Sequence, residues 1–387
     1  RLPGEVGPDA GLLIEQLRNA TQYHTLQTYK PSRWWRLTWQ WIRQLQPKTK
    51  KSKPRLPFGY TAAAWQRSSQ EVFKLNGMKR TLVACPPEGT ETVDPEDVSM
   101  ASLGYFNLHG LEDGAEWYGQ RHPGDSNPGI DYPVALSPHN LVKNGAAPKV
   151  IFSEACYGGL VSGKREGEAI SLRFLSIGSQ AVVGSTCVAY GSVAAPLIGA
   201  DLLGSLFWKH LQAGLTVGEA LMQAKIDLVR EMNRRQSFLD GEDQKTLLSF
   251  VLYGDPMVHL SGYQKGVKTL PRFRSHPKVA TVCDKPEGDL VENDLSSETM
   301  QVVKQVLEPY LPGFSAQDIS VTRQNLVQPA RKNGQSIHRT NLKPDIDHQR
   351  TVVTVTKQVQ IGIKKHHRFA RLTFNANGKV VKMALSR

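Results

Sequence analysis

Short apolar runs alternate with longer amphipathic segments through the first two thirds of the chain. The runs are bounded by glycine and polar turn residues, which is typical of buried parallel strands. They lie at residues 81–84, 105–108, 150–155, 180–185, 247–252 and 257–260. Helix-like segments lie at residues 9–23, 60–76, 166–177, 196–213 and 216–235. This alternation predicts an α/β fold with a parallel sheet.

The pattern changes after Gly262. Residues 263–288 are rich in proline, lysine and arginine and are predicted to form a linker, and residues 296–307 a helix. Beyond the polar segment 328–350, apolar side chains recur at every second position, which indicates an antiparallel meander with a turn at Asn377-Gly378. These positions are Val353, Val355, Val359, Ile361, Ile363, Ala370, Leu372, Phe374, Val381, Met383 and Leu385. We therefore predict an α/β unit over residues 1–262, a linker over 263–288 and a small α+β accessory domain over 289–387.

Two of the predicted strands end in a reactive side chain with glycine close behind, directly after His109 and two residues after Cys156. His109-Gly110 follows the run 105–108, and Cys156 ends the run from 150, with His109 preceding Cys156 by 47 residues. The carboxyl ends of neighbouring parallel strands meet at one edge of a sheet, so we expect the thiol and the imidazole there together. Cys156 would then act as a nucleophile and His109 as general acid and base. The amides of Gly110 and Cys156 would form an oxyanion hole.

The order and spacing of these motifs resemble the caspase-like clan of cysteine peptidases, and the gingipain-type family in particular. Three other stretches fit the same family, and the resemblance covers residues 1–260. These stretches are Arg1-Leu2-Pro3-Gly4, Gly184-Ser185-Thr186 and Tyr253-Gly254-Asp255-Pro256. The resemblance implies a caspase-like sheet sandwich with helices on both faces, a polypeptide substrate and no required cofactor. The accessory domain is vaguely similar to PepSY or cystatin-like folds.

Glu154-Ala155-Cys156 also resembles legumain, where the matching glutamate helps to line the primary specificity pocket. By this resemblance Glu154 would form such a pocket together with Thr186 and Tyr190. A carboxylate there would favour a basic or amide-bearing side chain before the scissile bond, arginine or lysine first and asparagine next. The alternative is that Glu154 only pairs with a neighbouring arginine or lysine.

The remaining cysteines lack such a context. Cys85, Cys187 and Cys283 are interpreted as packing residues, and no closely spaced Cys/His set indicates zinc. The loop 124–131 contains Asp and Asn, the ligand types that calcium prefers, and some gingipain-type enzymes bind calcium. Its spacing does not specify a site, so calcium is expected at most as a structural ion.

The net charge of +13 is concentrated near the start of the chain. No acidic residue lies between Glu15 and Glu71, and the same stretch holds five of the seven tryptophans. Residues 32–46 are predicted to form a helix with a tryptophan face, followed by a basic loop at 47–55. The favoured interpretation is a helix packed on the sheet. Contact with an anionic membrane surface through residues 32–55 is an alternative, and specific nucleic-acid binding is not expected.

Three functional classes follow from these patterns. The first is an active cysteine endopeptidase, for which the basic segments 48–55 and 272–278 are predicted sites of self-cleavage. The second is a catalytically silent caspase-like scaffold, and the third a membrane-surface or polyanion binder acting through residues 30–55. No apolar run is long enough to span a membrane. The chain has no signal segment and opens as if within a domain, which suggests a fragment or processed product; the resemblance favours a secreted or cell-envelope protein.

Overall fold

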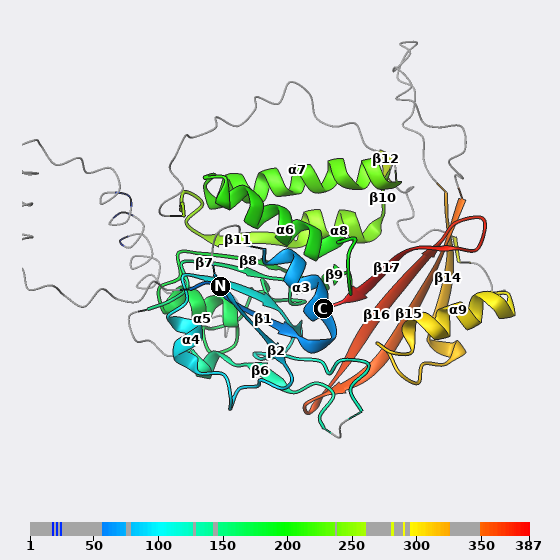
Figure 1. Ribbon diagram of the computed structural model, residues 1–387, viewed down its shortest axis with the longest axis horizontal. Helices are drawn as coiled ribbons and strands as arrows, with labels where there is room; N and C mark the ends of the chain where they lie inside the picture. Colours follow the sequence, from blue (N-terminus) through cyan, green and yellow to red (C-terminus); the bar gives the residue numbers. More distant parts are fainter. Residues whose placement is uncertain are drawn as a thin grey trace, which may run out of the picture.

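The computed structural model describes residues 56–74, 79–126, 129–141, 146–236, 238–260, 295–325 and 349–387, with residues 18, 21, 24, 280–281 and 289–290. The predicted helices at 9–23 and 32–46 and the segments 263–288 and 328–350 lie largely or wholly outside these residues. We call residues 56–260 the α/β unit, and residues 295–325 with 349–387 the C-terminal unit (Figure 1).

The α/β unit is built on a six-stranded sheet with the order β11-β8-β7-β3-β1-β2. All neighbouring strands are parallel except β11 and β8. The strands are β1 (Phe58–Ala62), β2 (Thr81–Cys85), β3 (Leu103–Asn107), β7 (Val150–Ser153), β8 (Ala181–Ser185) and β11 (Phe250–Gly254). The prediction of an α/β fold is thus confirmed, and β3 and β7, which precede the two reactive residues, are direct neighbours.

Helices cover both faces of this sheet, because its strands are apolar on both sides (Figure 1). Phe152 of β7 packs in one core with α6, and the adjacent Ile151 packs in the other core with α5. The first face carries the 3-10 turn η1 (Ala63–Trp65), α3 (Gln66–Val72), α6 (Gly199–Gln212), α7 (Val217–Gln236) and α8 (Gly241–Ser249). The second face carries α4 (Pro95–Ser99) and α5 (Ile170–Ser176).

The C-terminal unit is one helix against an antiparallel meander. Helix α9 packs Val303 and Leu307 onto Val353 and Leu372 of the sheet, as the period-2 pattern predicts. The elements are α9 (Ser297–Leu307), η3 (Ala316–Asp318), β14 (Ile319–Asn325), β15 (Gln349–Ile361), β16 (Lys364–Phe374) and β17 (Val380–Ser386). Two-residue strand β13 (Asp289–Leu290) extends the sheet at its far edge.

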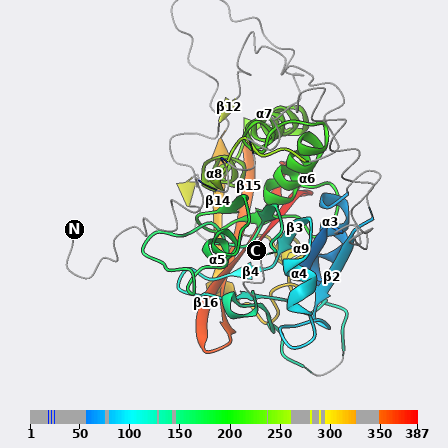
Figure 2. The same ribbon diagram turned by 90° about the vertical axis from the view of Figure 1, so that its left-hand side faces the viewer.

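The two units share a sheet. Strand β17 pairs antiparallel with β9 (Tyr190–Gly191) of the α/β unit, so β9 forms the sixth strand of the C-terminal sheet. Figure 1 shows β17 running into the α/β unit towards β9, and Figure 2 gives the view at right angles. The smaller elements are β4 (His109–Gly110), β5 (Trp117–Tyr118), β6 (Val134–Leu136), η2 (Pro138–Asn140), β10 (Phe238–Leu239) and β12 (Ala280–Thr281).

Several predicted element boundaries are wrong. The helix expected over residues 60–76 begins only at Gln66, because Phe58–Ala62 is a short run buried on both faces, which periodicity cannot separate from a helix. Residues 247–249 end α8 instead of starting a strand, and no strand forms over 257–260. The helix expected over 166–177 is restricted to Ile170–Ser176. Ile363 lies in the β15–β16 turn and Val381 is half-exposed, so neither belongs to the apolar face predicted for it.

Candidate functional site

His109 lies in β4, just beyond the carboxyl end of β3, and its side chain is buried. Its Nε2 is 3.1 Å from Oε1 of Gln120, and its ring packs edge-on against Trp65 with the ring centroids 4.4 Å apart. Burial, reinforced by the positive charge of Arg368, lowers the pKa of His109 well below its ordinary value. The imidazole is therefore neutral in this arrangement.

Cys156 lies three residues beyond β7, and its side chain is also buried. Its Sγ accepts a hydrogen bond from the Ala189 amide at 3.2 Å. Burial raises the pKa of the thiol to about 11, so the thiol is protonated near neutral pH. The following residue, Tyr157, has φ of 56°, the one left-handed non-glycine backbone in the described part of the chain. The chain thus turns sharply directly after the thiol, as expected where backbone strain is stored at a functional site.

The two motifs are in direct backbone contact. A Cβ added at Gly110 would overlap the carbonyl oxygen of Cys156, so only glycine allows the turn after His109 to lie against the turn at Cys156. The two turns therefore lie against each other at the carboxyl edge of the sheet, and the pairing of the thiol with the imidazole stays a prediction.

The approach to this site is filled by the last strand of the C-terminal unit. In the register of β17 and β9, Leu385 lies opposite Gly191 and Ser386 opposite Tyr190. The amide of Arg387 then donates to the carbonyl of Ala189 at 3.0 Å, next to the bond that Ala189 makes to the thiol. An extended peptide therefore runs along the edge of β9 and ends at Cys156.

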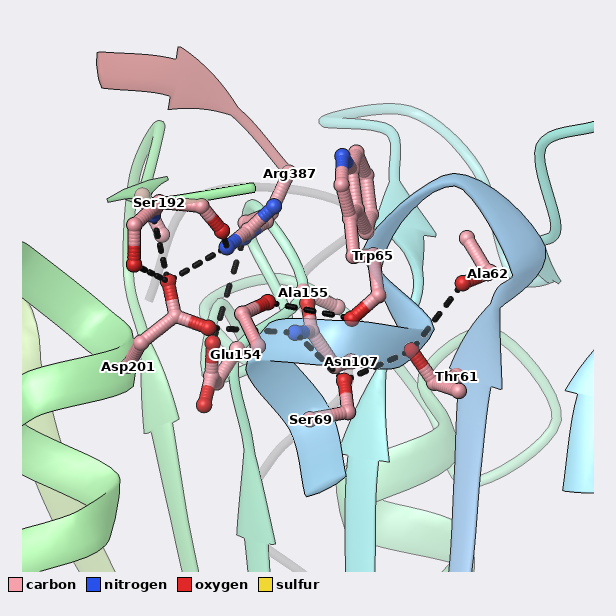
Figure 3. A network of polar contacts seen from close by, with 12 residues as sticks. Thr61, Ala62, Trp65, Ser69, Asn107, Glu154, Ala155, Ser192, Asp201 and Arg387 are labelled. Carbon is pink, nitrogen blue, oxygen red and sulfur yellow. Dashed lines mark hydrogen bonds and ion pairs between the residues drawn. The ribbon is translucent and has the colours of Figure 1, made fainter. Parts of the chain in front are cut away.

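The side chain of Arg387 enters a closed pocket of the α/β unit (Figure 3). Its Nη2 forms an ion pair with Oδ2 of Asp201 and donates to the carbonyl of Ser192 at 2.6 Å. The guanidinium carbon lies 4.3 Å from the centroid of the Trp65 ring, a cation–π distance. Asp201 is itself fixed by the Ser192 amide at 2.6 Å, so the carboxylate is oriented before any guanidinium arrives.

Glu154 supplies a second carboxylate to this pocket. Its Oε2 is 3.9 Å from Nε of Arg387, and its Oε1 accepts the Tyr105 hydroxyl at 2.9 Å. Burial and the nearby Asp201 charge raise the pKa of Glu154 well above its ordinary value, and Arg387 opposes that rise. Two carboxylates buried close together are unfavourable unless a cation lies between them.

A second arginine of the C-terminal unit reaches the histidine side of the site. Arg368 of β16 is buried and donates to Oε1 of Gln120 at 3.0 Å, the same oxygen that faces Nε2 of His109. It also donates to the Tyr132 hydroxyl at 3.0 Å and to the carbonyl of Ser386 at 3.3 Å. The C-terminal unit therefore holds both the thiol and the imidazole side of the site.

A cleft adjoins Cys156 through Tyr157 and Val188. The α/β unit forms one wall and β16 of the C-terminal unit forms the other. Its remaining lining residues are Leu111, Glu112, Asp113, Lys364, Lys365, His366, His367 and Phe369.

The structure brings together most of the site residues predicted from sequence, but not all. His109, Gly110, Glu154 and Cys156 lie together, and the backbone of Tyr190 pairs with Ser386. Residues in the segment from Ala189 to Ser192, together with Asp201, make further contacts in the site. By contrast, the hydroxyl of Thr186 bonds to the carbonyl of Ser249, away from the Arg387 pocket.

Sequence reasoning missed Asp201, Trp65 and Ser192. Asp201 had one local signal, a single acidic residue within the otherwise apolar start of a predicted helix. Trp65 was grouped with the tryptophans of the basic segment, yet its side chain is buried beside His109. The other four tryptophans of that group lie outside the described residues, so membrane contact through residues 32–55 stays a prediction.

The described part of the chain shows neither a metal site nor a membrane-spanning helix. It contains no group of three or more His, Cys, Asp or Glu residues that could hold a metal ion. In the loop 124–131, Asp125 and Asp131 lie 3.7 and 3.8 Å from Arg121 nitrogens, and calcium binding there stays a prediction. Among the described helices, none combines the length and the apolar character needed to cross a bilayer.

Residues 109–261, which include both His109 and Cys156, match the family model of peptidase family C25, the gingipain family. This match confirms the gingipain-type resemblance over those residues. A comparison with curated proteins found no match.

Three solved structures are similar to the chain. The first is the Arg-specific cysteine proteinase gingipain R, with 14% identity, a TM-score of 0.38 and coverage of 53% of this chain. The chain spans 47% of that protein. A complex of pro- and mature domains of RgpB from Porphyromonas gingivalis has 13% identity and a TM-score of 0.39, with 85% of this chain and 67% of that one covered. A structure described as a protease has 11% identity and a TM-score of 0.37, with 87% and 68% covered.

Proposed function

We propose that this protein is a cysteine endopeptidase that cleaves polypeptides after arginine, with Cys156 as nucleophile and His109 as general acid and base. The match to peptidase family C25 supports cysteine peptidase activity in general. The observation that carries the specific proposal is the position of Arg387. Through its bond to Ala189, whose amide donates to the thiol, an extended strand brings its backbone beside Cys156, and it delivers its side chain to a buried anionic pocket.

The proposed reaction places a substrate carbonyl where the backbone of Arg387 lies. Cys156 and His109 are both neutral in the closed arrangement, so attack begins when the imidazole accepts the thiol proton. The sulfur then bonds to the carbonyl carbon, and the amides of Gly110 and Cys156 are proposed to stabilise the oxyanion. The imidazolium protonates the departing amine, which leaves a thioester that water hydrolyses.

The pocket accounts for arginine preference through charge, shape and desolvation. A planar guanidinium can contact the Asp201 carboxylate, the Ser192 carbonyl and the Trp65 ring at the same time. Lysine retains the charge but lacks the planar face and the additional donors. An acidic or apolar side chain would leave Asp201 and Glu154 buried without a cation, which costs roughly 2–5 kcal/mol. We therefore expect at least ~30-fold preference for arginine over these residues.

The proposal is tested on the full chain carrying Arg387→Ala, which empties the pocket and leaves the dyad intact. Peptide substrates that differ only in arginine, lysine, asparagine, aspartate or leucine before the scissile bond are compared by kcat/KM. We expect cleavage after arginine to dominate. Adding Cys156→Ala should abolish turnover, whereas adding Cys187→Ala, which removes a neighbouring half-buried thiol, should not. Turnover that survives Cys156→Ala, or a preference for aspartate or leucine, would show that the proposal is wrong.

A further inference from the structure

A second basic side chain of the same strand sits in a second acidic pocket of the α/β unit. Lys382 lies on β17, and its side chain is 6% exposed. Its Nζ is 2.5 Å from Oδ2 of Asp240, 3.2 Å from Oδ1 of Asp243 and 3.8 Å from Oε2 of Glu242. This acidic cluster (Asp240, Glu242 and Asp243) is therefore centred on one ammonium group.

The acidic cluster is built by the start of α8 and not by the C-terminal unit. Asp240 is the N-cap of α8, and its side chain accepts the amide of Asp243 at 3.1 Å in a capping box. Gln236 donates to Asp243 at 2.8 Å and so fixes a second carboxylate. Burial and the Asp240 charge raise the pKa of Glu242 to about 7. Local structure thus holds three carboxylates close together, an arrangement that is favourable only with a cation present.

The side chains that fill the two pockets belong to the same stretch of the chain. Lys382 lies within β17 and Arg387 one residue beyond its end, five residues further on, so strand alternation does not relate the two side chains; both nevertheless contact buried carboxylates of the α/β unit. The alternate residues Met383 and Leu385 instead pack in the core of the C-terminal unit. A strand that carries a cation at these two positions is therefore recognised at both ends, while the β9 edge pairs with its backbone between Leu385 and Arg387.

We propose that the acidic cluster is a distal binding subsite for a lysine or arginine side chain five residues before the arginine in the specificity pocket. In the closed chain Lys382 occupies this subsite and anchors β17 over Cys156. In the open enzyme the same subsite selects peptides with the same spacing of two cations. The five-residue spacing is counted from the Arg387 pocket. This inference therefore rests on the proposed function, in which that pocket is the primary specificity pocket.

The occupant of the subsite is a peptide cation for a geometric reason. Arg371 of the neighbouring strand β16 lies 2.6 Å from Oε1 of Glu242, so one carboxylate of the cluster has its own partner in the closed chain. The other two carboxylates face Lys382 on the strand that ends at the thiol. A free metal ion cannot pair with the backbone of β9, whereas a basic peptide can.

The anchoring role is tested by the accessibility of Cys156, which does not depend on turnover. Iodoacetamide is added to the full chain, and alkylation of Cys156 is followed by peptide mapping. Lys382→Met, which keeps the apolar stem, should speed the reaction at least about tenfold, because it leaves the carboxylates without their cation. Lys382→Arg should react like the unmodified chain, and so should Lys379→Ala, which changes an exposed lysine of the preceding turn. Equal rates in the Lys382→Met and unmodified chains would overturn the anchoring role.

The subsite itself is tested by peptide affinity on the chain that carries both Lys382→Met and Arg387→Ala, so that neither pocket is filled by a cation of the chain itself. The probe is the acetylated, fluorescently labelled peptide Lys-Val-Val-Lys-Met-Ala-Leu-Ser-Arg, which matches residues 379–387, and binding is followed by fluorescence anisotropy. Replacing its second lysine by alanine should weaken binding at least about tenfold, and replacing its first lysine should change little. Adding Asp240→Asn and Asp243→Asn to the protein should remove the difference between the peptides. Equal affinity of the native and second-lysine-to-alanine peptides would show that the acidic cluster serves only the fold.

The outcomes separate this inference from the proposed function. If the protein binds peptides with both cations more tightly but hydrolyses no arginine peptide, the subsite is supported and the peptidase proposal is wrong. If the protein hydrolyses arginine peptides equally well with and without the distal lysine, the peptidase proposal is supported and the subsite proposal is wrong.

Discussion

Asp201 and Arg387 form a buried ion pair although they lie 186 residues apart in the sequence. Asp201 lies in the first turn of α6 in the α/β unit, and Arg387 follows the last strand of the C-terminal unit. Neither side chain is exposed. Because an unpaired charge would be costly there, we expect this pair to hold the two units together, and under the proposed function Asp201 would also bind the substrate arginine.

Removing the charge of Asp201 should therefore impair recognition of arginine. In the Arg387→Ala chain, we expect Asp201→Asn to lower kcat/KM for an arginine peptide at least ~100-fold, because a buried charge–charge contact with the substrate is lost. The control is Glu231→Gln, which removes a carboxylate that pairs with Arg234 and Arg235 on the surface of α7. Similar kinetics for the Asp201 and Glu231 variants would rule out Asp201 as the specificity residue.

The reactivity of Cys156 should rise with pH in both the closed and the open chain but level off at different pH values. In the full chain, burial raises the pKa of Cys156 to about 11, so the thiolate fraction and the alkylation rate should keep rising with pH until about pH 11. In the Arg387→Ala chain, water reaches the thiol, the burial that raises the pKa is relieved, and the profile should level off at lower pH. Identical profiles for the two chains would contradict this prediction.

Trp65 should contribute to arginine binding through its aromatic face. Trp65→Leu removes the ring that lies 4.3 Å from the Arg387 guanidinium carbon. A desolvated cation–π contact contributes about 1–2 kcal/mol, so kcat/KM for an arginine peptide in the Arg387→Ala chain should fall ~5- to 30-fold. Trp65→Phe keeps a ring and should lose less. Urea unfolding of both variants checks that the change does not come from a weakened fold, since Trp65 is also buried.

The central sheet should depend on Phe152 more than on any surface position nearby. Phe152 is buried on β7, with its ring centroid 5.6 Å from that of Phe250 and 5.2 Å from that of Phe207. Phe152→Ala should lower the free energy of unfolding by about 3–5 kcal/mol, because it leaves a cavity in the core. Leu248→Ala, at an 82% exposed position of α8, should change it by less than about 0.5 kcal/mol. Denaturant titration measures both values.

Local pattern was sufficient to predict the framework of the site. The runs before His109 and Cys156 are short, apolar and followed by glycine, which specifies a buried strand and a tight turn from neighbouring residues alone. Because parallel strands end at a common edge, the two turns could be placed together without coordinates. The same reasoning failed at Phe58–Ala62, where an apolar run buried on both faces has no periodicity that separates strand from helix.

The sequence by itself thus determined the α/β alternation, the meander at the end of the chain and the meeting of the turns at His109 and Cys156. Only the tertiary structure decided what fills the site. Residues of β17 alternate between the two units, so Lys382, which the period-2 pattern places on the polar face, is buried against α8. The pairing of β17 with β9, and with it the contact of Arg387 with Asp201, joins segments that are remote along the chain. Such contacts depend on how the two units pack against each other. That packing produces no periodic pattern in the sequence of either segment.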